Sequence, residues 1–277
     1  MSGTVVDGSP RPRRLPAPVG SVDGHVTLPR VVRSEWLKLR TLRSSLLILL
    51  AAMLAMVVFG AVIGHNTRNA AGLDPEDLVA SGPLQGYYLG QLLIGSLGVL
   101  VVSGEYSSGM IRATLAAVPR RLPVLLAKAL VFTVVVGAAM VAASVAGFLV
   151  AQGFLSGYRP TYSLSDPDVL RVVFGTGVYL TLVGLLGGAV GWLVRSTPGS
   201  LVALFATILV LPVMLLLFHG AWAEHVRAWL PTGAGASFST SLRMPGTLAP
   251  WAGLAVMVGW VVLAYLVAAV RLRRRDA

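Results

Sequence analysis

The sequence SLLILLAAMLAMVVFGAVIG, Ser45–Gly64, runs without a single charged side chain. The hydrocarbon core of a bilayer is about 30 Å thick, and a helix of about 20 apolar residues crosses it. Lipid offers no hydrogen-bond partner to an open backbone, so a segment that crosses it has to be helical. We therefore expect Ser45–Gly64 to be a membrane-spanning helix.

Five further stretches share this apolar character. They are residues 84–102, 129–151, 172–194, 200–218 and 251–270. The whole chain is 56% hydrophobic and 12% charged, whereas a soluble domain carries about a quarter charged residues. These features exclude a soluble enzyme and predict an all-α polytopic membrane protein with six transmembrane helices over residues 45–270.

Lysine and arginine are distributed unevenly around these spans. One side holds 17 of the 22, namely those before Ser45, those between 103 and 128, Arg195 and those after Val270. Because basic residues accumulate on the cytoplasmic side, both termini are predicted to be cytoplasmic. This topology, together with anionic membrane lipids, explains the net charge of +11 without a nucleic-acid partner. The arginine-rich composition favours a bacterium, so we expect a multi-pass protein of the bacterial cytoplasmic membrane.

The two ends of the chain have a different composition. Residues 1–29 hold five prolines with scattered glycine and arginine, which predicts a disordered cytoplasmic tail. They are not read as a signal peptide, because the apolar run begins only at Ser45 and is too long for an h-region. Residues 271–277 are predicted to form a basic cytoplasmic tail.

The segment 30–44, RVVRSEWLKLRTLRS, precedes the first span. Helical spacing places four apolar residues on one side: Val32, Trp36, Leu39 and Leu42. A basic amphipathic helix with a tryptophan lies in the plane of the membrane. The segment is thus either an interfacial helix with a mechanical role or a charged flank that fixes topology. Glu35 has only Lys38 as a basic neighbour at helical spacing, so any local ion pair joins these two.

The connection between the second and third spans, SGEYSSGMIRATLAAVPRRLP (103–123), is longer than a tight turn needs. A short helix is predicted over 110–118, with Ile111, Leu115 and Val118 on one face and Arg112 to the side. Glu105 lies at the membrane edge, as a helix-terminal charge or a salt-bridge partner. The connection is either a solvated loop or a docking helix for a cytoplasmic partner.

Two motifs resemble those of a known family. Residues 35–40, EWLKLR, resemble the EWxKLR motif before the first span of bacterial permeases of the ATP-binding-cassette (ABC) type 2 export superfamily. Residues 104–115, GEYSSGMIRATL, are similar to the GEYxxGTIRxTL motif after their second span, with Met110 in place of a small residue. Six spans with cytoplasmic ends fit the same family along essentially the whole chain.

The resemblance implies roles for both segments. Residues 30–43 would be the interfacial elbow helix, which includes Glu35, Trp36, Lys38 and Arg40. Residues 105–118 would include the helix that couples to an ATPase, with Glu105, Met110, Ile111, Arg112, Leu115 and Val118. The resemblance also implies export, an ABC ATPase subunit as partner, and a dimer with a second copy or a related permease.

The chain itself lacks the elements of an ATPase. A P-loop ends in Gly-Lys, but the only two lysines, Lys38 and Lys128, follow leucine and alanine. ATP and Mg²⁺ are therefore expected in a partner chain, and no cofactor in this one. Neither a thiolate site, an HExxH zinc motif nor a Gly-x-Ser-x-Gly nucleophile is present, so we predict a transport subunit without catalytic or metal-binding residues.

Few polar residues lie within the spans. Those singled out either line a pathway or bond helices to one another: Gln85, Tyr87, Gln91, Tyr179 and Pro212, the last expected to bend the fifth span. Lys128 is expected to extend its stem toward the cytoplasm. Outside the membrane, residues 221–230 predict a short surface helix.

Three functions remain open from the sequence. The first is the permease subunit of an ABC exporter, whose sparse polar lining favours an amphipathic or lipid-like cargo, with antibiotics and other drugs, peptides and lipids all open. The second is a membrane scaffold or assembly subunit without cargo. The third is a secondary transporter or channel, which is disfavoured because no Asp or Glu lies in the middle of a span.

Overall fold

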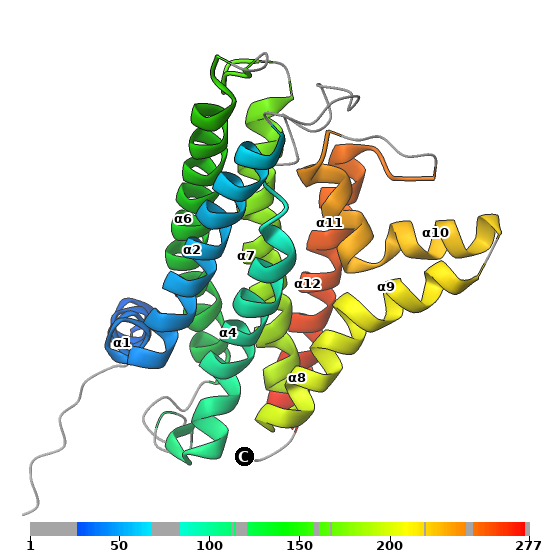
Figure 1. Cartoon of the computed structure of the whole chain (residues 1–277). Helices are drawn as coiled ribbons and strands as arrows, with labels where there is room; N and C mark the ends of the chain where they lie inside the picture. Colours follow the sequence, from blue (N-terminus) through cyan, green and yellow to red (C-terminus); the bar gives the residue numbers. More distant parts are fainter. Residues whose placement is uncertain are drawn as a thin grey trace, which may run out of the picture.

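The computed structural model describes residues 27–67, 84–111, 114, 121–157, 161–166, 168–218, 220–241 and 246–274. This part of the chain is helical and has no strand (Figure 1). Six helices within it are long and apolar enough to cross a membrane: Arg43–Thr67, Tyr87–Ser107, Leu122–Leu155, Val169–Val194, Thr197–Leu217 and Pro250–Arg274. The predicted all-α fold with six spans is confirmed.

The elements follow one another as a series of helices. They are α1 (Leu28–Thr41), α2 (Arg43–Thr67), α4 (Tyr87–Ser107), α6 (Arg121–Leu155), α7 (Val169–Val194), α8 (Thr197–Phe205), η2 (Ala206–Val210), α9 (Leu211–Met214), η3 (Leu215–Leu217), α10 (Ala221–Trp229), α11 (Pro231–Ser239) and α12 (Pro250–Arg274). The predicted spans each match one helix or, for the fifth span, the series α8 to η3.

Several helices extend beyond the predicted spans. α6 has 35 residues and is therefore about 52 Å long, well above the thickness of the hydrocarbon core. α12 continues to Arg274, so most of the predicted basic tail forms its last turn. The predicted bounds come from apolar composition, which shows only the part of a helix that lies in lipid. The hydrogen-bonded helix itself continues beyond the lipid. Residues 1–26 and 275–277 of the predicted tails lie outside the described residues, and α1 begins at Leu28.

Glycine contacts hold two pairs of helices close together. A Cβ added to Gly60 on α2 would overlap the backbone of Gly147 on α6. A Cβ added to Gly98 on α4 would overlap the carbonyl oxygen of Gly184 on α7. Lipid provides little driving force between helices, so close backbone packing at small residues provides much of the association. α2 with α6, and α4 with α7, therefore form a tight bundle.

The fifth span and α12 are the least buried of the six spans. Only 22% of the apolar window in Thr197–Leu217 is buried, against 72% for α7. A π-helical turn, η2, ends at Val210, two residues before Pro212, which has no N–H to donate to the carbonyl of Ile208. The expected irregularity at Pro212 is thus present. α8 and α9 lean away from the bundle and α10 returns toward it (Figure 1).

Two short helices lie at the end of this return. α10 confirms the helix predicted over 221–230. α11 had no counterpart in the sequence analysis, and it packs closely because a Cβ at Gly235 would overlap the ring of Tyr179. Trp260 of α12 donates a hydrogen bond from Nε1 to the carbonyl oxygen of Trp229, 2.9 Å away. These contacts attach α10 and α11 to α7 and α12.

α1 and the C-terminal end of α12 lie at the same end of the bundle, and α10 and α11 lie toward the other (Figure 1). The first end carries Arg30, Arg33 and Arg40 on α1 and three arginines in the last turn of α12. The positive-inside rule predicts that this end faces the cytoplasm. We refer to the two ends as the cytoplasmic end and the outer end.

Candidate functional site

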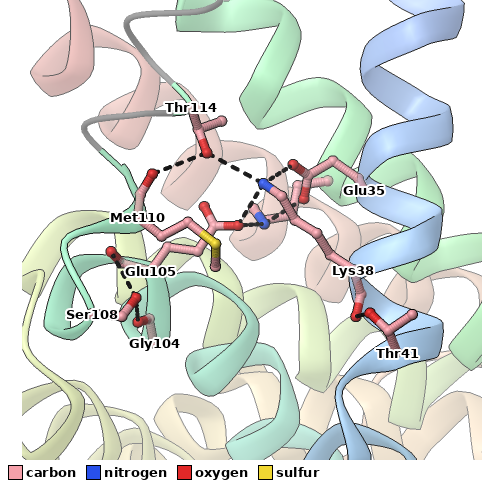
Figure 2. A network of polar contacts seen from close by, with 9 residues as sticks. Glu35, Lys38, Thr41, Gly104, Glu105, Ser108, Met110 and Thr114 are labelled. Atoms are coloured by element: carbon pink, nitrogen blue, oxygen red, sulfur yellow. Dashed lines mark hydrogen bonds and ion pairs between the residues drawn. The ribbon is translucent and has the colours of Figure 1, made fainter.

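Four charged side chains meet at the cytoplasmic end, and we call them the charge cluster: Glu35 and Lys38 of α1, Glu105 of α4 and Lys128 of α6 (Figure 2). Lys38 Nζ lies 2.7 Å from Glu35 Oε1 and 2.9 Å from Glu105 Oε1. Lys128 Nζ lies 2.5 Å from Glu35 Oε2 and 2.9 Å from Glu105 Oε1. Each lysine therefore bridges both carboxylates, and the four residues join three helices.

The cluster is largely withdrawn from solvent. The side chains of Glu35, Glu105 and Lys128 are 3%, 5% and 5% exposed, and that of Lys38 is 22% exposed. Burying an unpaired charge costs several kcal/mol, so charges in such a place have to compensate one another. Two carboxylates and two ammonium groups give a net charge of zero. Loss of any one of the four would leave an uncompensated buried charge and destabilise the protein.

The pKa of Glu35 shows which effect dominates around it. Burial alone raises the pKa of this carboxyl, because it disfavours the charged form. The positive charge of Lys128 and the hydrogen bonds from Lys128 and Lys38 outweigh burial, and the pKa lies below its usual value of 4.5. Glu35 is therefore a carboxylate at neutral pH.

The pKa of Lys38 is shifted upward, opposite to that of Glu35. Burial lowers the pKa of its ammonium group, but the hydrogen bonds to Glu35 and Glu105 and the two negative charges raise it above the usual 10.5. The local pair with Glu35 matches the sequence expectation. Both residues of α1 thus carry full charges over the whole physiological pH range.

The cluster reaches toward the segment that follows α4. Lys38 Nζ donates to Thr114 Oγ1 at 3.3 Å, and Thr114 donates to the carbonyl oxygen of Met110 at 3.1 Å (Figure 2). Glu105 Oε2 is buried and has no hydrogen-bond partner within the described residues. Gly109, with φ of +72°, allows the chain to turn after α4. The start of the candidate docking segment is therefore tied to α1.

Lys128 is the residue that sequence reasoning placed wrongly. It was expected to extend toward the cytoplasm, but it is buried and contacts Glu35 and Glu105. One feature of the sequence could have indicated a special role for Lys128: Lys38 and Lys128 are the only lysines in an arginine-rich chain. An ammonium group is a compact charge that can bridge two carboxylates, whereas a guanidinium is planar and larger. For Glu105, the salt-bridge alternative is the one the geometry shows.

The other residues of the predicted coupling segment are only partly described. Met110 is 39% exposed, while Ile111 is 4% exposed and belongs to an apolar cluster that also contains Val124, Leu125 and Trp192. Met110, Ile111 and Thr114 are helical. Arg112, Leu115 and Val118 lie outside the described residues, so the apolar face predicted for this helix stays a prediction.

α1 contacts the bundle through a different side from the one that apolar spacing indicated. Val31, Glu35 and Leu39 are buried, whereas Trp36 is 43% exposed and Arg40 is exposed. Only Leu39 is common to both sides. The charge cluster explains the difference, because a buried glutamate cannot be recognised from hydrophobicity. Trp36 and Arg40 lie on the exposed side of α1.

Two of the predicted polar residues bond helices to each other. Tyr179 of α7 donates a hydrogen bond from its hydroxyl to Gln91 Oε1 of α4 at 2.6 Å, and both residues are buried. The other three line a cavity of about 420 Å³ at the outer end: Gln85, Tyr87 and Pro212. Glu224 and Arg227 of α10 also line this cavity. The five residues thus divide between a helix contact and an outer cavity.

Comparison with known proteins agrees with this architecture. No curated protein matches the chain at a significant level. A family described as ABC-2 family transporter protein matches residues 31–225, which include α1 from Val31 onward, the charge cluster and the first five spans. The match covers well over half of the chain. The chain therefore belongs to the ABC-2 family of transporter membrane proteins and is a permease component of an ABC transporter.

Proposed function

We propose that this chain is the permease subunit of a bacterial ABC exporter, driven by a separate ATPase that docks at the cytoplasmic end. The ATPase would contact α1 and the segment after Glu105. The observation that carries this proposal is the charge cluster, which joins α1, α4 and α6 directly above that segment. A push on the segment would act on three helices together instead of bending one.

The packing around the cluster supports transmission of movement. α6 is attached to α2 and α4 to α7 through glycine contacts at Gly60 and Gly98. A force on the cluster is thereby spread over four spans. Packed interiors respond to force by shifting as rigid bodies between discrete arrangements. We propose that α1, α2, α4, α6 and α7 form such a body, here called the inner block.

When the inner block moves, the helices outside it would have to bend. The outer arm, which we define as residues 197–229 from α8 to α10, contains the π-helical turn and Pro212. Irregular turns of this kind are common at functional bends. The cavity of about 420 Å³ lies between this arm, α4 and α11. Displacement of the inner block relative to the arm would change the outer cavity, where an amphipathic cargo would leave.

Site-specific photocrosslinking in the native bacterium tests the docking directly. A photoreactive amino acid would replace Ser108, which is exposed at the cytoplasmic end of α4, or Trp222, which is exposed on α10. We expect the Ser108 position to crosslink to a P-loop ATPase, identified by mass spectrometry. The Trp222 position is the matched control and should give no such product.

Reconstitution then separates the three candidate functions. An exporter should move cargo in liposomes only with its ATPase and ATP, with cargo accumulating on the side of α10. Transport by the purified chain alone would instead show a secondary transporter or channel. A complex that binds the ATPase but never alters its rate of ATP hydrolysis would show a scaffold. Either of the last two results overturns the proposal.

A further inference from the structure

The outer cavity of about 420 Å³ combines apolar surface with two charged side chains. Leu84 in the turn before α4, Tyr87 at the start of α4 and Pro212 of α9 provide apolar and aromatic wall. Glu224 and Arg227 of α10 provide one negative and one positive charge. Small-molecule sites have volumes of about 300–1,000 Å³ and mostly apolar walls with a few polar groups. The size and lining of the cavity therefore suit an amphiphile.

The two charges of the cavity are not used by the protein itself. Glu224 and Arg227 lie three residues apart on α10, a spacing at which opposite charges often pair. Within the described residues, neither side chain forms an ion pair or a hydrogen bond. Glu224 is exposed and Arg227 is half-buried. Both charges are thus available to a ligand that enters the cavity.

The groups around these charges suit a ligand of both signs. Tyr87 and Tyr88 both line the cavity, and their rings stack with centroids 4.2 Å apart. The face of a tyrosine ring attracts cations, so an ammonium group is favoured by the rings as well as by Glu224. The guanidinium of Arg227 offers a planar fork of N–H donors, which matches a phosphate or a carboxylate. A ligand with only one of these charges would leave one partner unused.

The position of α10 relative to the membrane gives an independent argument. Trp222 and Trp229 on this helix are both 56% exposed. Exposed tryptophan accumulates at the level of the lipid head groups. Side chains three residues apart on a helix have Cβ atoms about 5–6 Å apart, which is comparable with the separation of the two charges in a zwitterionic head group. The cavity therefore lies where the charged end of an amphiphile resides in a membrane.

From these observations we propose that the outer cavity binds a zwitterionic amphiphile. Its ammonium group would lie beside Glu224 and the tyrosine pair, and its phosphate or carboxylate beside Arg227. Its apolar chain would lie along Leu84 and Pro212. A phospholipid head group and a free amino acid group both carry this pair of charges. That the ligand is the cargo rests on the proposed function, whereas its binding does not.

Binding of four single-chain amphiphiles to the purified full-length chain tests the site. The delipidated protein in a neutral detergent would be titrated by native mass spectrometry. Two ligands are zwitterions, lysophosphatidylethanolamine and a long-chain N-alkyl amino acid. The others carry one charge, lysophosphatidylglycerol and an alkylamine. We expect one zwitterion per chain, bound about fivefold more tightly than either singly charged ligand. The tighter of the two zwitterions identifies a lipid head group or an amino acid as the natural chemistry.

Variants of the two charges make the result specific. Glu224→Gln should remove the preference for lysophosphatidylethanolamine over lysophosphatidylglycerol and leave binding of the latter unchanged. Arg227→Gln should remove the preference for the zwitterion over the alkylamine. Asp168→Asn is the matched control, because it removes an exposed carboxylate at the outer end that does not line the cavity. A wild type without preference for zwitterions, or equal losses in Asp168→Asn and Glu224→Gln, would overturn the proposal.

Transport in liposomes separates this inference from the proposed function. ATP-dependent export of lysophosphatidylethanolamine that is lost in Glu224→Gln and Arg227→Gln would support both. ATP-dependent export of another cargo by a chain whose cavity shows no preference for zwitterions would overturn the inference and leave the exporter standing. Selective binding of zwitterions without any ATP-dependent transport would support the binding site and overturn the exporter.

Discussion

The cytoplasmic and outer ends of this permease are held together by different forces. At the cytoplasmic end, four mutually compensating charges join α1, α4 and α6. At the outer end, no described ion pair joins two helices. The contacts are a tyrosine–glutamine hydrogen bond, a tryptophan–carbonyl hydrogen bond, a hydrogen bond from Arg171 of α7 to the carbonyl oxygen of Phe238 on α11, and small-residue packing around α11. The described ion pair there, between Arg171 and Asp168, joins residues three positions apart. A cavity of about 420 Å³ remains between the elements there.

This contrast indicates how one end can control the other. A buried ion cluster is an all-or-none contact, because separating any pair exposes a charge to a low dielectric. Hydrogen bonds cost less to rearrange than a buried ion cluster, roughly 1 kcal/mol each and up to about 3 kcal/mol for the one with the charged donor Arg171. The cytoplasmic end is therefore suited to transmit a push without deforming, and the outer end to change its shape.

The largest effect is expected from breaking the cluster. Glu35→Ala leaves Lys128 buried with only Glu105 as a partner, and removal of one member of a buried ion pair costs about 3–5 kcal/mol. Urea-induced or thermal unfolding of the purified chain in detergent would measure the loss. Fully apolar replacement of the cluster with Glu35→Leu, Lys38→Met, Glu105→Leu and Lys128→Met should recover most of the stability but not the coupling. Wild-type stability in Glu35→Ala would mean that the charges do not hold the helices.

A smaller loss is expected from separating α4 and α7. Gly98→Ala places a methyl group against the backbone of Gly184, and overpacking of this kind costs about 1–3 kcal/mol. Gly153→Ala on α6 is the matched control, because nothing lies within 4 Å of a Cβ there. The control should gain stability by about 1 kcal/mol through helix propensity. Equal melting temperatures for the two variants would contradict the close contact.

A still smaller effect is expected at the outer end of the bundle. Tyr179→Phe removes the hydroxyl that donates to Gln91 and keeps the ring against Gly235. The loss should be about 0.6–1 kcal/mol, as for other hydrogen bonds between membrane helices. A double-mutant cycle with Gln91→Leu would measure the coupling energy of the pair. A loss as large as that of Glu35→Ala would remove the difference between the two ends.

The least change is expected from pH. The lowered pKa of Glu35 means that its stabilisation is present above its unfolded value and is lost as pH falls through the folded one. The raised pKa of Lys38 means that its stabilisation is complete below its unfolded value and is lost as pH rises through the folded one. The melting-temperature difference between wild type and Glu35→Gln should therefore stay constant from about pH 6 to 9 and shrink below about pH 4. A change near pH 7 would show that other groups govern the cluster.

Much of the fold followed from the sequence because lipid imposes a simple rule. Apolar runs of about 20 residues have to be helices, so all six spans were predictable. α11 was missed because its sequence, PTGAGASFS, has neither a strong apolar stripe nor a charged face, and its helix depends on packing against α7 and α12.

The candidate site was predictable only in part. The pair of Glu35 and Lys38 followed from local spacing, but its connection to Glu105 and Lys128 depends on how three helices meet. No local rule of sequence indicates that a lysine at the end of a span turns inward to two carboxylates. The division of the five polar span residues between a helix contact and an outer cavity likewise required the tertiary arrangement.

Spin-label distances test the central claim most directly, since the chain has no cysteine and labels attach only where one is introduced. The first pair, Ser34→Cys and Val134→Cys, lies within the inner block. The second, Val134→Cys and Val213→Cys, joins that block to the outer arm. In the complex trapped with ATP and vanadate, we predict an unchanged distance for the first pair and a shifted distance for the second. A first pair that moves as far as the second, or a second pair that stays fixed, would contradict the account.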